Sequence, residues 1–419
     1  MDLSGNWDWE TGKRIVSDFD SWKESFQQVE EPYVSPDGEK IAAIVRDGNL
    51  MGVCVNGETW EQGYDRVWYP RFSPDNRLAS LVSEGGEWTV AVDGRPWEES
   101  FTFVWNTQFA AGGKSVIVSA VHGEKGYVAV CNETSWEQGF SYMTQVTPDR
   151  EGQNIAAAVQ TVAVKEREIE KFQRGCFSIA VNGEVRGEVF VNVWDPVLDG
   201  GGGRVAACVR KSLYDYSVAV DGVAWTRDFN SVWAPKFNPL DSSVTAPVKS
   251  GGKWFLARDG EILWNRGFVQ VLDHGYAPDG RIAAVVAPRF GRWTVAVDGE
   301  PWGVSFPDLA TDLTISPAGG RAACVGRDGG QWVICVDGQV WEGRFDMAWS
   351  PVFSPDGKHV AAKVEKEGAY FILLDGLSVE GKFSALWNPL FSPDGQKILI
   401  RGIGTGEERG RCLRIVRPV

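Results

Sequence analysis

Histidine is scarce in this chain: three residues in 419, far apart in the sequence at His122, His274 and His359. General acid–base catalysis and metal binding most often need a histidine beside a second reactive side chain. His274, which follows Asp273, is the best acid–base candidate. The motifs of serine hydrolases, zinc proteases and phosphate-binding loops are missing. We therefore expect no catalytic residues and a protein that is not an enzyme; an enzyme that works in a central funnel is the alternative.

The seven cysteines form no Cys-x-x-Cys pair, and neither a haem attachment motif nor iron–sulfur spacing occurs. Carboxylates recur in Asp-Gly turns, but without the twelve-residue calcium loop pattern. These absences predict no cofactor and no metal site in this chain. The cysteines are expected to be small buried residues of strands.

Positive charge is also in short supply, because 42 Lys and Arg face 56 Asp and Glu and the net charge is −14. A nucleic-acid partner requires a basic face, so none is expected. The start of the chain lacks the pattern of a signal peptide, and no apolar run is long enough to span a bilayer. We expect a cytoplasmic protein without direct membrane insertion, peripheral on the inner face of the membrane only through its partners.

Glycine (49 residues) and tryptophan (20 residues) are abundant instead, and they mark an internal repeat. A Ser-Pro-Asp-Gly-like turn recurs ten times, five of them in weaker form. The prolines at 239, 278, 317, 355 and 393 lie 39, 39, 38 and 38 residues apart. A period of this size is typical of repeat architectures.

Each repeat contains a second turn, Asn-Gly or Asp-Gly, between short β-branched runs such as 41–45 and 88–92. Such turns between alternating apolar runs predict β-hairpins, since Asn, Asp and Gly tolerate positive φ. One repeat therefore holds four short strands in about 38 residues, which is typical of a propeller blade. The fold class expected is all-β, a β-propeller of about ten four-stranded blades.

The two ends of the chain complement each other. The last repeat stops after three strands, and residues 22–26 (Trp-Lys-Glu-Ser-Phe) match 97–101, the start of a fourth strand. We expect an N-terminal strand and three C-terminal strands to form one closing blade, which removes an open sheet edge. Residues 1–419 are then a single propeller, with a tail at 1–20, a closing strand at 21–30 and repeats at 31–419; two rings of about five blades are the alternative.

Eighteen of the twenty tryptophans fall in three columns of the repeat, and only Trp7 and Trp9 lie outside them. A column repeated in every blade indicates blade-to-blade packing, because a ligand site needs only a few indoles in one place. A propeller that binds small molecules or glycans through exposed tryptophans is the alternative.

One segment interrupts the period, since Asn132 and Asn182 are 50 residues apart where neighbouring turns are 38 or 39 apart. The extra residues predict a charged hairpin arm on one rim, and loops on rigid scaffolds often carry function. We expect partner contacts from the arm and from the off-column tryptophans. The candidate residues are Lys165, Glu166, Arg167, Glu168, Glu170, Lys171, Phe172, Arg174, Trp7 and Trp9.

The Ser-Pro-Asp-Gly turn before an Ile-Ala-Ala-like strand, as at 35–44 and 354–364, resembles TolB-type and WD40-like propeller repeats. The Gly-His and Trp-Asp signature of true WD40 repeats is missing. The tryptophan columns and the lack of cluster ligands are also similar to the TmcD family, the tryptophan-rich subunits of Tmc transmembrane electron-transfer complexes in sulfate-reducing bacteria. That resemblance implies a scaffold subunit whose partners are protein subunits, among them iron–sulfur and membrane cytochrome b subunits.

Overall fold

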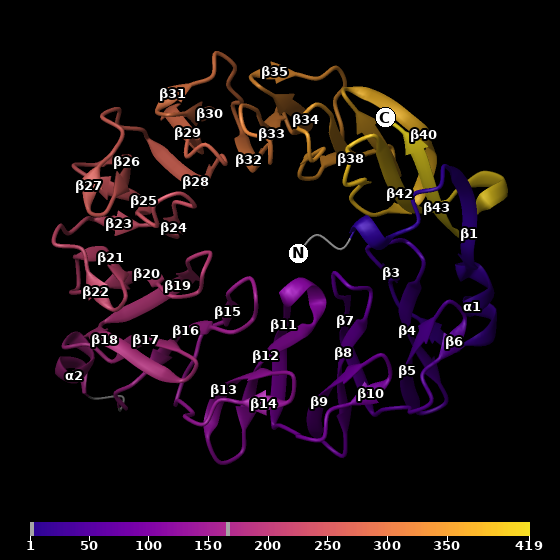
Figure 1. Ribbon diagram of the computed structural model, residues 1–419, viewed down its shortest axis with the longest axis horizontal. Helices are drawn as coiled ribbons and strands as arrows, with labels where there is room; N and C mark the ends of the chain where they lie inside the picture. The colour runs from indigo at the N-terminus through magenta and orange to yellow at the C-terminus, as the bar shows by residue number, and fades with distance from the viewer. Residues whose placement is uncertain (1–3, 165–167) are drawn as a thin grey trace. The chain divides into compact units, whose positions relative to one another are not determined.

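The computed structural model describes residues 4–164 and 168–419, and these are built almost wholly from antiparallel strands (Figure 1). The chain divides into two compact units, residues 79–273 and residues 4–78 with 274–419. The boundaries fall at the start of β8 and inside β28.

The first unit holds four complete sheets and three further antiparallel strands. These three strands are β8 (Leu78–Glu84), β9 (Glu87–Val92) and β10 (Arg95–Pro96). The sheets are β11 (Phe103–Ala110), β12 (Ser115–His122), β13 (Gly126–Cys131) and β14 (Thr134–Ser135); β15 (Thr147–Pro148), β16 (Ile155–Gln160), β17 (Phe177–Val181) and β18 (Glu184–Phe190); β19 (Asn192–Leu198), β20 (Val205–Arg210), β21 (Tyr216–Val220) and β22 (Val223–Ala224); and β23 (Ser231–Val232), β24 (Lys236–Phe237), β25 (Val244–Ser250), β26 (Lys253–Arg258) and β27 (Glu261–Ile262). Its short helices are η2 (Ala111–Gly113) and α2 (Ile169–Gln173).

The second unit has the same plan. Its strands up to residue 78 are β1 (Gly12–Asp18), β2 (Gln28–Val29), β3 (Tyr33–Val34), β4 (Ile41–Asp47), β5 (Leu50–Val55), β6 (Glu58–Thr59) and β7 (Arg66–Phe72). After β28 (Gln270–Tyr276) follow β29 (Ile282–Arg289), β30 (Arg292–Val297), β31 (Glu300–Pro301), β32 (Leu309–Ile315), β33 (Ala322–Asp328), β34 (Gln331–Val336) and β35 (Gln339–Val340). The chain ends with β36 (Met347–Ala348), β37 (Val352–Phe353), β38 (Val360–Lys366), β39 (Ala369–Leu374), β40 (Leu377–Leu386), β41 (Leu390–Phe391), β42 (Lys397–Gly404) and β43 (Arg411–Pro418). The short helices are η1 (Ser4–Asn6), α1 (Phe19–Ser25) and η3 (Gly406–Glu408).

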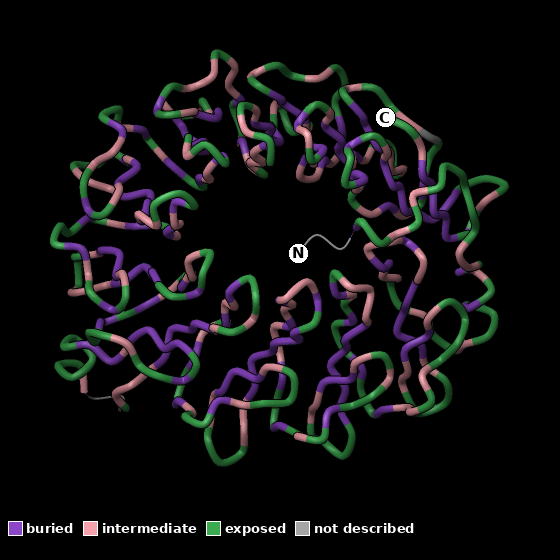
Figure 2. The backbone as a smooth tube through the Cα atoms, viewed as in Figure 1, coloured by how far each residue is buried: buried purple, intermediate pink, exposed green. Residues whose placement is uncertain are grey.

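Within each complete sheet the strands follow chain order and each is antiparallel to its neighbours, as in β11–β14 and β32–β35. The second strand of a blade is its most buried part (Figure 2), because both faces of the sheet are covered; five of the six residues of β16 are buried. The all-β propeller expected from the repeats is therefore confirmed.

The Asn or Asp of the second turn binds a different strand of its blade. In eight repeats its side-chain oxygen accepts the backbone N–H that opens the second strand, at 2.8–3.0 Å. The pairs are Ile41–Asn56, Val116–Asn132, Ile155–Asn182, Val205–Asp221, Val244–Asp259, Ile282–Asp298, Ala322–Asp337 and Val360–Asp375. Asn56 and Asp221, for example, adopt φ of 51°. The turn residue thus fixes both the hairpin and the start of the inner strand.

Five tryptophans of the first column pack their blade on the next one. A Cβ placed on Gly183 would lie 3.5 Å from the indole of Trp136, which comes from the preceding blade. The same arrangement joins Gly57 to Trp22, Gly260 to Trp225, Gly338 to Trp302 and Gly376 to Trp341. Glycine is favoured here because φ is positive, and the indole lies in van der Waals contact with the position. For these residues the packing interpretation of the column is confirmed.

The last blade is completed by the N-terminal segment, but by other residues than expected. β1 pairs with β43 over Gly12–Asp18 (Figure 1), while residues 21–25 of the predicted closing strand at 21–30 belong to α1. The placement of that strand, and of residues 1–20 as a plain tail, was wrong. Asp18 caps α1 by accepting the N–H of Asp20. Trp22 fits the first tryptophan column of the repeat because its indole contacts Gly57, although its backbone is helical.

Two arginines join this closing blade to the blade that follows α1. Arg401 is buried and donates from Nη1 to the carbonyls of Ser35 (3.0 Å) and Pro36 (3.1 Å). Arg414 donates from Nε to the carbonyl of Asp37 at 2.8 Å. Burial lowers the pKa of Arg401 to about 10.

Candidate functional site

The insertion of the β15–β18 blade forms the arm expected from the sequence, and part of it is helical. Its base is closed where the N–H of Thr161 donates to the carbonyl of Cys176 at 2.9 Å. Beyond the base, α2 replaces the hairpin strand that was expected (Figure 1). Of the predicted contact residues, Lys165, Glu166 and Arg167 lie outside the described residues.

The charges of α2 are paired within the arm. Lys171 lies 3.5 Å from Glu168, and Arg174 lies 3.9 Å from Glu170. Such pairs three or four residues apart on an exposed helix contribute little, about 0.2–0.5 kcal/mol each. They leave the charged face of α2 without a net charge, so the apolar side chains become its distinctive feature.

The apolar residues of the arm are exposed together with their neighbours in the same blade. Ile169 is 66% exposed and Phe172 39%, and their spacing of three places them on one side of α2. We call the following set the arm surface: Tyr142 (46%), Ile169, Phe172, Val185 (45%) and Val189 (42%). Exposed apolar residues are ordinary when single; this set is notable because all five belong to one blade and two of them lie on the same side of α2.

A groove of about 800 Å³ lies at the base of the arm. One wall is Gln138–Ser141 of the preceding blade, and the other is the turn Gly183–Val185. Gln160, Thr161 and Ala163 of the arm base form the end. Both polar and apolar residues line the groove, and no two of them form a nucleophile–base or acid–base pair. Such a groove is better suited to binding a peptide segment than to catalysing a reaction.

Aromatic rings continue from this groove along the first unit. Tyr142 contacts Phe177 at 6.0 Å and Tyr127 at 5.8 Å between ring centroids, and Tyr127 contacts Trp105 at 5.9 Å. The sequence placed Trp105 in a packing column but did not show that Tyr142 would be exposed at its end. Ring contacts of this kind restrict the orientations that the Tyr142 side chain can adopt, and a restricted side chain loses less entropy on binding.

Trp7 and Trp9 form a separate feature in the second unit. Their rings stack at 6.2 Å, and the indole of Trp9 donates to the carbonyl of Ser4. Lys397 holds this segment by donating from Nζ to the carbonyl of Trp9 at 2.7 Å. Both indoles are half-buried and lie in the second unit, whereas the residues of the arm surface lie in the first.

His122 lies in the first unit, and His274 and His359 lie in the second. His122 lies 3.7 Å from Glu99, and His359 binds Asp375 at 2.7 Å in a turn. His274 is buried. Within 4–164 and 168–419, no three His, Cys, Asp or Glu residues are grouped so that they could hold a metal ion.

The cysteines are all thiols, and six of the seven are buried. Cys176 lies at the base of the arm, where burial raises its pKa. Burial raises the pKa of Cys54 to about 11 and of Cys412 to about 12. These thiols stay protonated at neutral pH, which makes them poor nucleophiles.

Comparison with known proteins gives similarity of structure only. No family model matches the chain. No curated protein matches it either. A crystal structure of a eukaryotic initiation factor has a TM-score of 0.45 at 14% identity and covers 85% of this chain and 88% of its own. The Cps50 (Swd1) β-propeller domain of Myceliophteria thermophila has a TM-score of 0.33 at 15% identity, covering 66% of this chain and 97% of its own. A putative TolB from Agrobacterium tumefaciens has a TM-score of 0.27 at 19% identity, covering 44% and 73%.

The propeller assignment rests on the sheets of the chain itself. Among the residues that the structure describes, no helix is both long and apolar enough to cross a membrane.

Proposed function

We propose that this protein is a non-catalytic binding subunit that docks another protein on the arm surface. The observation that carries the proposal is the exposure of Ile169 and Phe172 on an arm that interrupts an otherwise regular repeat. A solvated loop without a role gains nothing from two large apolar side chains on the same side of a helical turn. Covering them with an apolar partner segment is favourable, at roughly 25 cal/mol per Å² of apolar area.

The partner that fits is a protein segment with apolar side chains and basic flanking residues. Its apolar part matches Ile169, Phe172 and Val189. Its positive charge matches the net charge of −14, which speeds association with a basic partner and disfavours an acidic one. Aromatic and apolar anchors at the centre of an interface carry most of its binding free energy.

The test is purification of tagged protein from its native host, comparing the wild type with the double variant Ile169→Asp/Phe172→Asp. We expect a partner in near-stoichiometric amount with the wild type and at least tenfold less with the double variant. The matched control is Leu240→Asp, since Leu240 is as exposed as Ile169 but lies in the β23–β27 blade of the same unit. Thermal melting should be unchanged in all three proteins. Equal recovery with the wild type and the double variant would contradict the proposal.

A finer assignment follows from the resemblance to TmcD: an accessory subunit on the cytoplasmic side of a membrane-associated electron-transfer complex. It is supported by the tryptophan columns and by the lack of cluster or haem ligands in the sequence. Its test is the visible spectrum of the same preparation. Cytochrome and iron–sulfur absorption that is lost with the double variant would support this assignment; a colourless stoichiometric partner would exclude it while leaving the docking proposal intact.

A further inference from the structure

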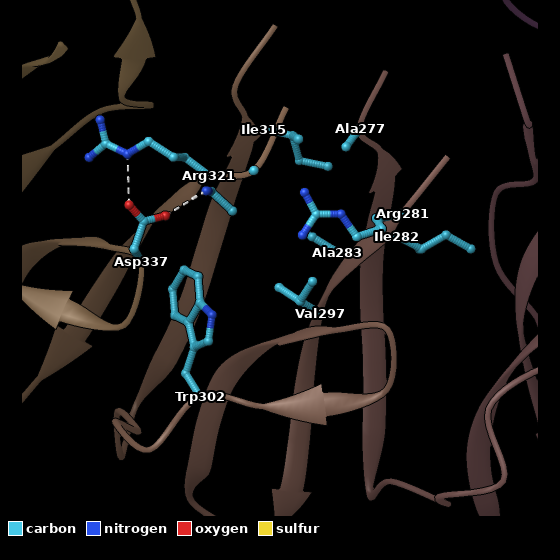
Figure 3. A pocket seen from close by; sticks show the side chains of 11 residues that line it. Ala277, Arg281, Ile282, Ala283, Val297, Trp302, Ile315, Arg321 and Asp337 are labelled. Carbon is cyan, nitrogen blue, oxygen red and sulfur yellow. Dashed lines mark hydrogen bonds and ion pairs between the residues drawn. The ribbon is translucent and has the colours of Figure 1, made fainter. Parts of the chain in front are cut away.

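A small cavity of about 160 Å³ lies between the β29–β31 strands and the β32–β35 blade of the second unit (Figure 3). Its floor is apolar and comes from Ile282, Ala283, Val297 and Ile315. The indole of Trp302 forms one wall and is half-buried, whereas the corresponding Trp136 and Trp225 are buried. None of the features assigned to protein docking uses these residues.

The cavity exists because this blade departs from the repeat at two positions. In the Ser-Pro-x-Gly turn that begins at Ser316, Gly320 stands where the other turns carry Glu39, Lys358 and Gln396. Two residues later Ala322 opens the second strand, where the other blades have Ile41, Val360 and Ile398. Both departures remove side chains from the same space, since both residues line the cavity. A close-packed interface would be expected to fill such a gap, because an empty one costs stability.

Two arginines line the cavity and differ in what they bind. Arg321 is held in the wall, because Nε donates to Asp337 at 2.8 Å and Nη1 donates to the carbonyls of Gly357 and Lys358. Both oxygens of Asp337 are in turn satisfied, since the other accepts the N–H of Ala322 at 2.9 Å. This pair is therefore part of the wall.

Arg281 is available at the mouth of the cavity. Its Nε donates to Asp279 at 2.8 Å, and within the described part of the chain neither of its Nη atoms has an acceptor. Nη2 lies 3.8 Å from the position of a Cβ on Gly320, so the guanidinium overhangs the gap that this glycine leaves. Figure 3 shows it extending among the lining residues while Arg321 turns to Asp337. Paired Nη donors are suited to a carboxylate.

We propose that this cavity binds a small apolar carboxylic acid, with its hydrocarbon part on the apolar floor beside Trp302 and its carboxylate on Arg281. The size fits, because an apolar cavity on the order of 150 Å³ accepts a molecule such as benzene. The carboxylate replaces the water around Nη1 and Nη2 by charge-assisted hydrogen bonds. This site is independent of the arm surface, which lies in the other unit.

Benzoate is a suitable probe, with neutral benzamide as its isostere, and binding to the full-length protein is measured by ligand-observed NMR. We expect benzoate to bind with a dissociation constant on the order of 1 mM or below, and benzamide at least about fivefold more weakly. Ala322→Val introduces a residue that other blades carry at this position. Because it fills the cavity, it should lower the affinity for benzoate at least about tenfold. Arg281→Gln should lower the affinity for benzoate to that for benzamide, and it should leave the affinity for benzamide unchanged.

The matched control is Arg77→Gln, because Arg77 occupies the same turn position in another repeat and likewise binds its aspartate, Asp75. It should leave benzoate binding unchanged. No benzoate binding at about 10 mM would overturn the proposal. Equal binding of benzoate and benzamide, or a loss with Arg77→Gln as large as that with Arg281→Gln, would overturn it as well.

Discussion

At the scale of single residues, the propeller depends on pairs formed between a tryptophan and a glycine. Trp136 on Gly183 and Trp225 on Gly260 are the same contact repeated at two blade junctions. The indole buries a large apolar area, and the glycine provides the positive φ of the turn on which the ring packs.

Trp136→Ala is expected to lower the free energy of unfolding by about 3–5 kcal/mol, since it removes a buried aromatic side chain from a junction between blades. The measurement is denaturant unfolding. Phe290→Ala is the control, because Phe290 is 94% exposed and its loss should change stability by no more than about 0.5 kcal/mol. Equal losses for the two variants would contradict the packing role of the column.

The Ser-Pro-Asp-Gly turns should make the protein sensitive to acid. Hydrogen bonds from Ser354 and Lys358 lower the pKa of Asp356 to about 2, and hydrogen bonds also lower the pKa of Asp279 and Asp394. The unfolded chain takes up these protons first, so the stabilisation is complete above the ordinary pKa of 3.8 and is lost as the pH falls towards 2. The urea concentration at the unfolding midpoint should decrease as the pH is lowered from about 4 to about 3. The difference in this midpoint between the wild type and Asp356→Asn should become smaller over the same range. A difference in midpoint that does not change with pH would contradict this role of the turn.

At the scale of elements, the closing blade shows what the sequence could and could not predict. Strands and turns were predictable because Asn-Gly and Asp-Gly at a period of about 38 residues define them locally. The helix α1 was missed because Trp22 keeps its column contact with Gly57 from a helical backbone, so a matching side chain does not fix the local conformation. The groove beneath the arm was missed because its walls are 138–141 and 183–185, which only the fold brings together.

The pairing of β1 with β43 can be tested at Ile15, which lies opposite Leu413. Ile15→Pro should destabilise the protein by roughly 1–3 kcal/mol and leave an unprotected sheet edge that promotes self-association. Ile15→Thr keeps a β-branched residue and should be close to wild type. Melting temperature and light scattering measure both effects; a proline variant that melts with the wild type would contradict the role of β1.

At the scale of the whole molecule, regular repeats provide a stiff frame, and the few departures from the repeat are candidates for function. The arm adds residues to the β15–β18 blade, while Gly320 and Ala322 remove side chains from another. The repeats continue beyond the insertion between Asn132 and Asn182, and no Pro/Ser-rich linker separates two sets of repeats. This predicts one ring of ten blades, with two rings of about five as the alternative. Class averages from negative-stain electron microscopy would distinguish the two.

The most direct test of the docking proposal is photo-crosslinking in the native host from single positions on the surface. A benzophenone side chain placed at Phe172 should crosslink to one partner protein, whereas the same group at Leu240, on another blade of the same unit, should not. Crosslinks to that partner from 172 alone are the predicted result. Crosslinks that are equal from both positions, or that come only from 240, would contradict the claim that the arm is the docking surface.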